Sequence, residues 1–182
     1  MPIHRPACLV PAWLCLISSI WVSSVGGAQH PSLGRPLTPD EIRKIDITIA
    51  PDGRGLPSGS GSVAAGEKVY AQKCQACHGL QGAGNPMERL TGGIGSLTSG
   101  KPVKTAVSYW PAATTLFDYI RRAMPPTSPQ SLTDDEVYAV TAYILSIDGV
   151  VAKDALLDAK SLPQVKMPNR DGFVRWWPVP RR

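Results

Sequence analysis

The residues best suited to chemistry lie in one short stretch, residues 74–78, which reads Cys-Gln-Ala-Cys-His. Two thiols three positions apart, followed directly by an imidazole, form the pattern for covalent haem attachment. Cys74 and Cys77 can each form a thioether with one vinyl group of the porphyrin, and His78 can bind the iron as its proximal ligand. The stretch therefore predicts one covalently attached haem c.

A Cys-x-x-Cys pair also occurs in structural zinc sites and in redox-active dithiols. A structural zinc needs about four ligands, usually from two such pairs. The only other cysteines, Cys8 and Cys15, lie in a segment that we expect to be removed. A thioredoxin-like dithiol lies near a β-α-β pattern, which this sequence does not show. Haem attachment is therefore the favoured interpretation.

An iron bound by His78 has a second axial position, for which three methionines compete. Met87 follows His78 by only nine residues, which makes it awkward for the chain to reach the opposite haem face, and Met167 lies beyond the last predicted helix. Met124 stands 46 residues after His78, between a predicted helix and two prolines. A thioether ligand raises the potential and suits electron transfer. We expect Met124 to be the distal iron ligand, with Met167 or a vacant, gas-binding position as the alternatives.

The elements that must position these residues are helices. Ser62 can cap a helix over residues 63–73, which the haem motif closes. Gly66 lies inside this helix, where glycine costs about 1 kcal/mol against alanine. Its presence suggests that another backbone approaches closely at this point.

Two further helices follow a glycine-rich loop. One spans about residues 114–123 and stops before Pro125, because proline disfavours helix at the residue before it. Thr133 and Glu136 form a capping box that opens the last strong helix, and Gly149 is a plausible stop. The fold class is therefore mostly α, a small helical domain wrapped around one haem.

The loop over residues 79–112 can turn tightly around a flat ligand because it contains many glycines. Pro86 could offer its carbonyl to the second ring nitrogen of His78, a contact that orients such ligands; an ordinary loop proline is the alternative. The Ser-Tyr-Trp stretch at residues 108–110 has polar groups that could reach a haem propionate. Packing of these rings in the core is equally consistent with the sequence.

The first 28 residues have the pattern of a secretory signal. A weakly basic start precedes an apolar run over residues 7–22, and residues 26–28 (Gly-Gly-Ala) form a small-residue cleavage site. A retained membrane anchor is the alternative, although Pro11 interrupts the run and a span needs about 20 residues. We expect a periplasmic protein with no membrane span after removal of the signal, consistent with haem attachment outside the cytoplasm.

The charge excess lies at the C-terminal end of the chain. Residues 29–148 hold 11 basic and 11 acidic side chains, whereas residues 149–182 hold seven basic and three acidic ones. This is not the dense basic block of a nucleic-acid binder, so no nucleic acid is expected as a partner. The tail also contains Trp176 and Trp177, which predicts either docking of a partner or packing on the chain's own surface.

These patterns divide the chain into four parts: a signal peptide (1–28), an N-terminal arm (29–61), a haem domain (62–149) and a basic C-terminal extension (150–182). Within the arm, residues 38–41 form a capping box for a short helix. Alternation of Ile45, Ile47 and Ile49 with polar residues predicts a brief extended segment. Residues 56–61 are expected to be a linker with no core of its own, and the arm packs either on the haem domain or on a partner.

The predicted haem domain resembles a class I cytochrome c. The resemblance rests on residues 74–79 (Cys-Gln-Ala-Cys-His-Gly), residues 122–125 (Arg-Ala-Met-Pro) and the helices before and after them. In that family the first and last helices cross at a small residue and aromatic rings, for which Gly66, Tyr70 and Tyr143 are the candidates here. The resemblance implies one low-spin haem with His and Met ligands, and no bond-making chemistry by the protein.

The flanks resemble the haem subunit of the Sox sulfur dehydrogenase, whose relatives accompany molybdenum sulfite dehydrogenases. The matching stretches are residues 34–36, 52–57, 108–115 and 166–173. The likeness implies an electron carrier that accepts single electrons from a periplasmic molybdenum dehydrogenase and passes them to a downstream cytochrome or oxidase. The larger Sox subunit has two haem domains, so the single motif here favours a single-haem sulfite dehydrogenase. A quinoprotein or alcohol dehydrogenase partner and a haem-based gas sensor are the alternative functions.

Overall fold

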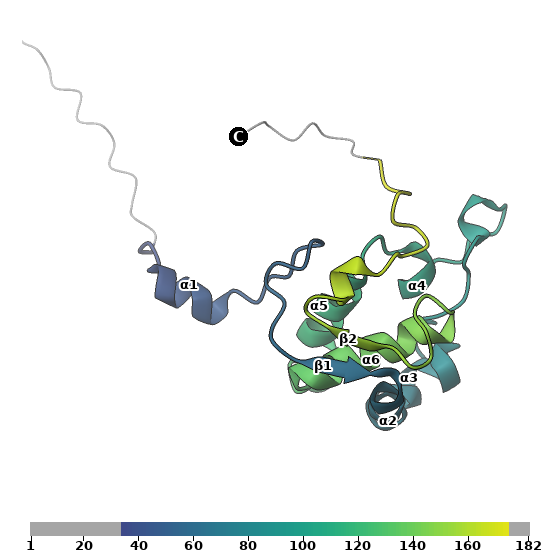
Figure 1. The fold of residues 1–182 in the computed structure, drawn as a ribbon, viewed down its shortest axis with the longest axis horizontal. Helices are drawn as coiled ribbons and strands as arrows, with labels where there is room; N and C mark the ends of the chain where they lie inside the picture. The colour runs from purple at the N-terminus through teal and green to yellow at the C-terminus, as the bar shows by residue number, and fades with distance from the viewer. Residues whose placement is uncertain (1–33, 175–182) are drawn as a thin grey trace, which may run out of the picture. The chain divides into compact units, whose positions relative to one another are not determined.

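Helices make up most of the regular structure in the computed structural model, which describes residues 34–174 (Figure 1). Residues 34–38 belong to a separate unit, and the unit that contains the helices and strands begins at Pro39. In chain order, its α-helices (α), 3-10 helices (η) and strands (β) are α1 (Pro39–Ile45), β1 (Ser60–Ser62), α2 (Val63–Lys73), α3 (Gln75–His78), η1 (Leu80–Gly82), η2 (Ser96–Thr98), α4 (Ala106–Tyr109), α5 (Ala113–Ala123), α6 (Asp134–Ile147), β2 (Leu156–Asp158) and η3 (Leu162–Gln164). The predicted mostly α fold is confirmed.

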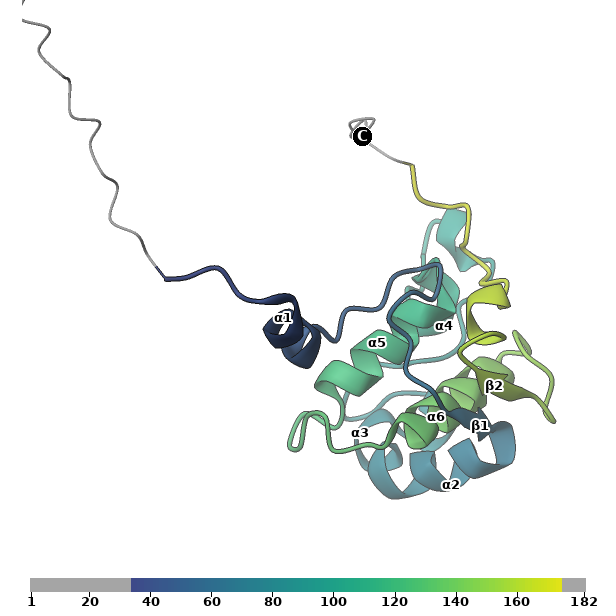
Figure 2. The same cartoon turned by 60° about the vertical axis from the view of Figure 1, so that its left-hand side comes forward.

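Helices α2 and α6 form the central contact of the fold and lie side by side in both views (Figures 1 and 2). The Ser62 hydroxyl caps α2 by accepting a hydrogen bond from the Ala65 amide at 3.2 Å, as predicted. Gly66 is the point of contact, because a Cβ atom at this position would collide with the backbone of Ala139 in α6. The close approach predicted at Gly66 is therefore a backbone-to-backbone contact between the two helices.

Two tyrosines extend this helix contact, as the family resemblance implied. The rings of Tyr70 in α2 and Tyr143 in α6 lie 5.2 Å apart between centroids. The Tyr70 hydroxyl donates a hydrogen bond to the Gly79 carbonyl at 2.9 Å. Burial raises the pKa of Tyr70 to about 12, so the hydroxyl remains a neutral donor at physiological pH. This bond ties α2 to the turn that follows α3.

Helix α6 begins and ends where the sequence predicts. The Thr133 hydroxyl accepts a bond from the Glu136 amide at 3.2 Å, and the Glu136 carboxylate accepts one from the Thr133 amide at 2.8 Å. At the other end, Gly149 has a φ of +72° and Val150 donates its amide to the Leu145 carbonyl at 3.0 Å. This geometry is the glycine-terminated helix end known as the Schellman motif. Both ends of α6 are therefore fixed by local sequence.

A two-stranded antiparallel sheet joins the segment before α2 to the segment after α6. Gly61 of β1 pairs with Leu157 of β2, and a Cβ atom at Gly61 would collide with Ala139 of α6. The predicted loop or linker is therefore found over residues 56–59, but Ser60 and Gly61 belong to β1, contrary to the prediction. The glycines and serines there suggested a loop, but at Gly61 a small residue is needed because the strand passes directly over a helix.

The second half of the predicted N-terminal arm packs on the helices. The Pro51 carbonyl accepts a hydrogen bond from the Thr114 hydroxyl at 3.3 Å, and the Pro57 carbonyl accepts one from the Tyr138 hydroxyl at 2.8 Å. The side chain of Ile49 is buried in the core. This part of the arm therefore belongs to the same body as the helices. Helix α1, by contrast, has no buried residue.

The extended segment predicted from the alternating isoleucines fails at Ile45, and its residues form no strand. Ile45 is the last residue of α1 and is 67% exposed, and no strand follows it before β1. The Asp46 carboxylate accepts a hydrogen bond from the Thr48 amide at 2.9 Å. Such a local bond from an aspartate favours a turn over a strand, so only Ile49 of the three isoleucines reaches the core.

Helix α5 begins one residue before the predicted start and ends at Ala123 as predicted. Leu116, Phe117 and Ile120 are buried on its inner face. The helix ends at Met124, whose backbone is extended, because the next residue is proline. The end of this helix therefore fixes where the Met124 side chain can lie.

Part of the predicted C-terminal extension also belongs to the core. Leu157, Leu162 and Met167 are all buried in the cluster that contains the inner faces of α5 and α6. The Asn169 side-chain amide donates a hydrogen bond to the Tyr109 carbonyl at 2.6 Å. The domain boundaries predicted at residues 61 and 149 remain a prediction, but both flanks contribute residues to one core.

Several sequence predictions concern residues outside the described range of 34–174. They are the signal peptide over residues 1–28, with Cys8 and Cys15, and the docking role of Trp176 and Trp177. Within the described range, no helix combines the length and the apolar character that crossing a membrane requires.

Replacement of Gly66 by alanine is expected to destabilise the protein although alanine favours helix. Alanine gains about 1 kcal/mol of helix propensity, but its methyl group must push α6 away at Ala139, and overpacking typically costs 1–3 kcal/mol or more. We expect Gly66→Ala to lower the midpoint of thermal unfolding, measured by calorimetry. Gly100→Ala is the matched control, because nothing lies within 4 Å of its Cβ position. Equal midpoints for the two variants would contradict the helix contact.

Candidate cofactor site

The Cys-x-x-Cys-His motif lies at the junction of α2 and α3. Cys74 ends α2, donating its amide to the Tyr70 carbonyl at 2.9 Å, and its own carbonyl accepts the His78 amide at 2.9 Å. This helical turn puts Cys74 and Cys77, three positions apart, on the same side of the chain. The local backbone therefore presents two thiols and one imidazole together.

These three residues lie on the wall of a cavity of about 580 Å³. This volume lies within the range that cofactor sites in proteins occupy. Residues from α3, α4, α5 and α6 and from the loops between them form its wall. Aliphatic side chains make up much of the wall: Leu90, Leu116, Ile120, Leu132, Val140 and Ile144. The cavity is therefore suited to a large, mostly apolar ligand.

The ring of His78 is oriented by a backbone carbonyl. Its Nδ1 atom lies 2.9 Å from the carbonyl oxygen of Glu88. A carbonyl can only accept, so Nδ1 carries the proton and Nε2 is left as the nitrogen that can bind a metal. The prediction that the Pro86 carbonyl makes this contact is wrong, because the loop places the carbonyl two residues later against the ring. No side-chain pattern marks Glu88, since its backbone makes the contact.

The surroundings of Cys74 do not favour a reactive thiolate. Both are free cysteines, and burial is the main cause that raises the pKa of Cys74 to about 11. A thiol in a redox-active pair has a lowered pKa, since the thiolate is the nucleophile. Within residues 34–174, no group of three or more His, Cys, Asp or Glu side chains is placed to hold a metal ion.

The three candidate methionines have different surroundings. Met124 lies on the wall of the same cavity as His78. Met87 is 54% exposed, and Met167 is 3% exposed within the hydrophobic core; neither lines the cavity. Of the described methionines, only Met124 therefore shares the cavity with the histidine.

The end of α5 and the turn that follows hold Met124 in place. Its amide donates the last hydrogen bond of the helix, to the Ile120 carbonyl at 3.0 Å. The next two residues, Pro125 and Pro126, also line the cavity and have no amide hydrogen to donate. The Ser128 amide then closes the turn on the Pro125 carbonyl at 2.9 Å. The position of the Met124 segment therefore depends mainly on the contacts that hold α5 against the rest of the protein.

Aromatic residues form one side of the cavity. Tyr109, Trp110 and Tyr119 line it, and the Trp110 and Tyr119 rings meet edge to face with centroids 5.6 Å apart. Ser108, predicted as a possible polar contact to the cofactor, is instead 2% exposed and donates its hydroxyl to the Val103 carbonyl at 2.8 Å. Its hydroxyl belongs to the capping box of α4. Ser108 therefore positions α4 and does not line the cavity.

Basic side chains also line the cavity. Lys73 makes an ion pair with Glu136 of α6 at 3.1 Å. Lys104 lies 5.1 Å from the centroid of the Tyr109 ring, and Arg89 follows the Glu88 carbonyl that orients the histidine. No sequence pattern marks Arg89 or Lys104, because isolated cations in a loop form no motif. Such cations suit a ligand that has both an apolar body and anionic groups.

The donor set and the cavity fit a covalently held haem. Two thiols, a histidine with an available Nε2 atom and a methionine sulfur all lie on the wall of one mostly apolar space. Haem iron is commonly held by histidine and methionine in cytochromes of the c type. The chemistry of the residues present thus agrees with the haem predicted from the sequence.

Comparison with known proteins supports this conclusion. Residues 61–144 match the profile of the family described as "Cytochrome C oxidase, cbb3-type, subunit III". The chain also matches a chain in the crystal structure of the sulfane dehydrogenase SoxCD from Paracoccus pantotrophus, with a TM-score of 0.73 and 44% sequence identity. This match covers 80% of the present chain and 72% of the other. The chain belongs to the class I c-type cytochromes. Haem binding and electron transfer are therefore properties of this cytochrome's family.

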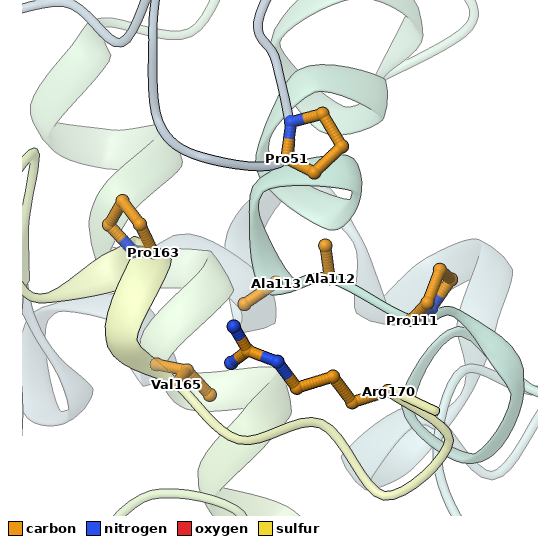
Figure 3. Close-up of a pocket in the computed structure, with 7 residues that line it drawn as sticks. All are labelled: Pro51, Pro111, Ala112, Ala113, Pro163, Val165 and Arg170. Atoms are coloured by element: carbon orange, nitrogen blue, oxygen red, sulfur yellow. The ribbon is translucent and has the colours of Figure 1, made fainter. Parts of the chain in front are cut away.

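The cytochrome has a second, smaller pocket of about 210 Å³ (Figure 3). It is lined by prolines and small apolar residues from three parts of the chain, together with the extended side chain of Arg170: Pro51, Pro111, Ala112, Ala113, Pro163, Val165 and Arg170. It shares no lining residue with the larger cavity. This pocket marks the place where the arm, the start of α5 and the segment after β2 meet.

Loss of either motif thiol is expected to impair covalent attachment. Cys74→Ser and Cys77→Ser each leave one thioether site, so less haem should stay with the polypeptide after acid-acetone extraction. Intact mass and haem-stained gels measure this fraction. Cys15→Ser is the matched control, because Cys15 lies in the predicted signal peptide. Equal covalent haem in all three variants would contradict the attachment site.

Proposed function

We propose that this cytochrome holds one haem c, attached through Cys74 and Cys77, with His78 Nε2 and Met124 Sδ as axial iron ligands. The observation that carries the proposal is that all four residues lie on the wall of one cavity. The Glu88 carbonyl supports the role of His78, because it fixes the ring orientation and leaves Nε2 available. The surroundings of Met87 and Met167 support Met124 over the other two described methionines.

The proposed activity is single-electron transfer without bond-making chemistry by the protein. When bound, haem c supplies the one-electron chemistry of its iron. The residues of the chain set the conditions for that chemistry. A thioether ligand from Met124 raises the reduction potential, the aliphatic wall limits water around the site, and the Glu88 carbonyl keeps the imidazole in one orientation.

The proposed electron donor is a periplasmic molybdenum sulfite or sulfur-compound dehydrogenase, with a downstream cytochrome or oxidase as acceptor. The likeness to a chain of a sulfane dehydrogenase structure supports a dehydrogenase of sulfur compounds. The predicted signal peptide over residues 1–28 supports the periplasm. The single Cys-x-x-Cys-His motif in the chain supports one haem, as in a single-haem sulfite dehydrogenase.

Substitution of Met124 tests the proposed ligand. Met124→Ala should lose the weak far-red sulfur-to-iron charge-transfer band and lower the reduction potential, because the thioether ligand is gone. Met87→Ala and Met167→Leu are the controls. The first changes an exposed side chain, and the second conserves volume at a buried one. If Met124→Ala retains the band while a control loses it, the ligand assignment is wrong.

Reduction by the native periplasm tests the proposed partner. Periplasmic extract of the source organism, supplied with sulfite, should reduce the ferric cytochrome, and the visible haem spectrum measures the rate. The matched control is extract from cells grown on tungstate, in which molybdenum enzymes are inactive; reduction should be largely lost. Equal rates in both extracts would contradict a molybdenum donor, and reduction by an alcohol but not by sulfite would favour the alternative dehydrogenase.

A separate measurement tests the gas-sensor alternative. Rapid CO binding to the reduced protein at neutral pH would favour the gas sensor.

A further inference from the structure

Arg122, near the end of α5, connects the helix to the N-terminal arm. Its guanidinium donates hydrogen bonds to the Asp118 carboxylate, at 2.8 Å from one nitrogen and 3.2 Å from the other. It also donates to the backbone carbonyl of Ile47 at 2.9 Å. The side chain thus joins two segments that lie 75 positions apart in the sequence. One guanidinium makes both contacts because its donors form a planar fork.

The arm offers a fixed point at Ile47. The residue after Ile47, Thr48, donates its amide hydrogen bond to the Asp46 carboxylate at 2.9 Å, and Ile49 is buried in the core. The arm also folds back on itself, because the Ala50 amide donates to the Arg54 carbonyl at 2.9 Å. The backbone that directly follows the Ile47 carbonyl is therefore fixed by its own hydrogen bonds and by the burial of Ile49.

The other end of the connection lies two residues before Met124. The final helical bond of α5 is the one from Met124 to Ile120, and the two prolines that follow donate no further bonds. The last turn of a helix frays readily when little holds it. A guanidinium at the C-terminal end of a helix interacts favourably with the helix dipole, and here it also binds the arm. The bond from Arg122 to the Ile47 carbonyl joins the arm to this last turn.

We propose that Arg122 is a positioning residue for the distal ligand, tying the turn that carries Met124 to the arm at Ile47. The inference rests on the proposed ligation by Met124. It gives the arm a function at the haem site, since the arm's backbone holds the ligand segment in place. Arg122 differs from a residue that only forms an ion pair within its own helix, because it also donates a hydrogen bond to the Ile47 carbonyl in the arm.

The test uses the full-length, haem-loaded cytochrome with Arg122→Gln. Loss of the ties should let the Met124 segment open more often. Imidazole should then bind the ferric protein roughly tenfold faster, as expected for loss of a hydrogen bond to a charged group. The far-red charge-transfer band should also disappear at a lower temperature than global unfolding followed by circular dichroism.

Arg121→Gln is the matched control. Arg121 belongs to the same turn of α5, but its Nε atom pairs with Asp134 at the start of α6, at 2.9 Å. Removal of this ion pair leaves the bonds from Arg122 to Asp118 and Ile47 in place, so the imidazole rate should stay near that of the wild type. Asp118→Asn should give a smaller increase than Arg122→Gln, because the bond from Arg122 to Ile47 is retained.

The possible outcomes separate this proposal from the ligand assignment. If Met124→Ala loses the band but Arg122→Gln and Arg121→Gln show the same imidazole rates, Met124 is the ligand and the positioning role of Arg122 is overturned. If Met124→Ala keeps the band, the ligand assignment itself is overturned. If Arg122→Gln does not fold, Arg122→Lys replaces it. Lysine keeps the charge but lacks the planar fork, so a rate unchanged from the wild type in this variant would overturn the proposal.

Discussion

Helices α2 and α6 touch backbone to backbone at Gly66, and this contact determines where the cofactor-binding residues lie. No side chain fits between Gly66 and Ala139, so the two helices can cross only at this point and at this spacing. The C-terminal end of α2 then brings Cys74 to the edge of the cavity. On α6, Val140 and Ile144 form part of the cavity wall. The contact therefore fixes the attachment point relative to the part of the wall that α6 forms. Interior packing transmits such a constraint because it leaves few voids.

The helix pair does not close the cavity alone, and the flanks of the chain complete the structure. Strand β1 leads into α2, and strand β2 follows α6, so their pairing holds both helices from the same side. The arm before β1 reaches α5 through the bond from Arg122 to Ile47, and the segment after β2 reaches α4 through the bond from Asn169 to Tyr109. The part of the arm around Ile47 and the segment up to Asn169 are thus part of the same body as the helices.

Local sequence signals predicted much of this arrangement. The motif at residues 74–78 and the capping boxes each depend on residues a few positions apart, and their geometry does not need the rest of the chain. Gly66 was marked by its local cost to helix formation, although the residue that it contacts, Ala139, is distant in the sequence. Two of the failed predictions depended on partners that no local side-chain pattern marks. Gly61 forms a strand because Leu157 pairs with it, and Glu88 orients His78 through a carbonyl that every residue type possesses. The same reasoning explains why the contact from Arg122 to the arm was not predicted, although Arg122 belongs to the Arg-Ala-Met-Pro stretch, since its partner in the arm is also a backbone carbonyl.

The central claim is that one iron lies between His78 and Met124 in the cavity bounded by α3, α5 and α6. The most direct measurement is a crystal structure of the haem-loaded protein, with an anomalous difference map recorded at the iron absorption edge. A single iron peak bonded to His78 Nε2 and Met124 Sδ, with thioethers at Cys74 and Cys77, is the result expected. An iron coordinated by Met87 or Met167, or a peak outside this cavity, would contradict the claim.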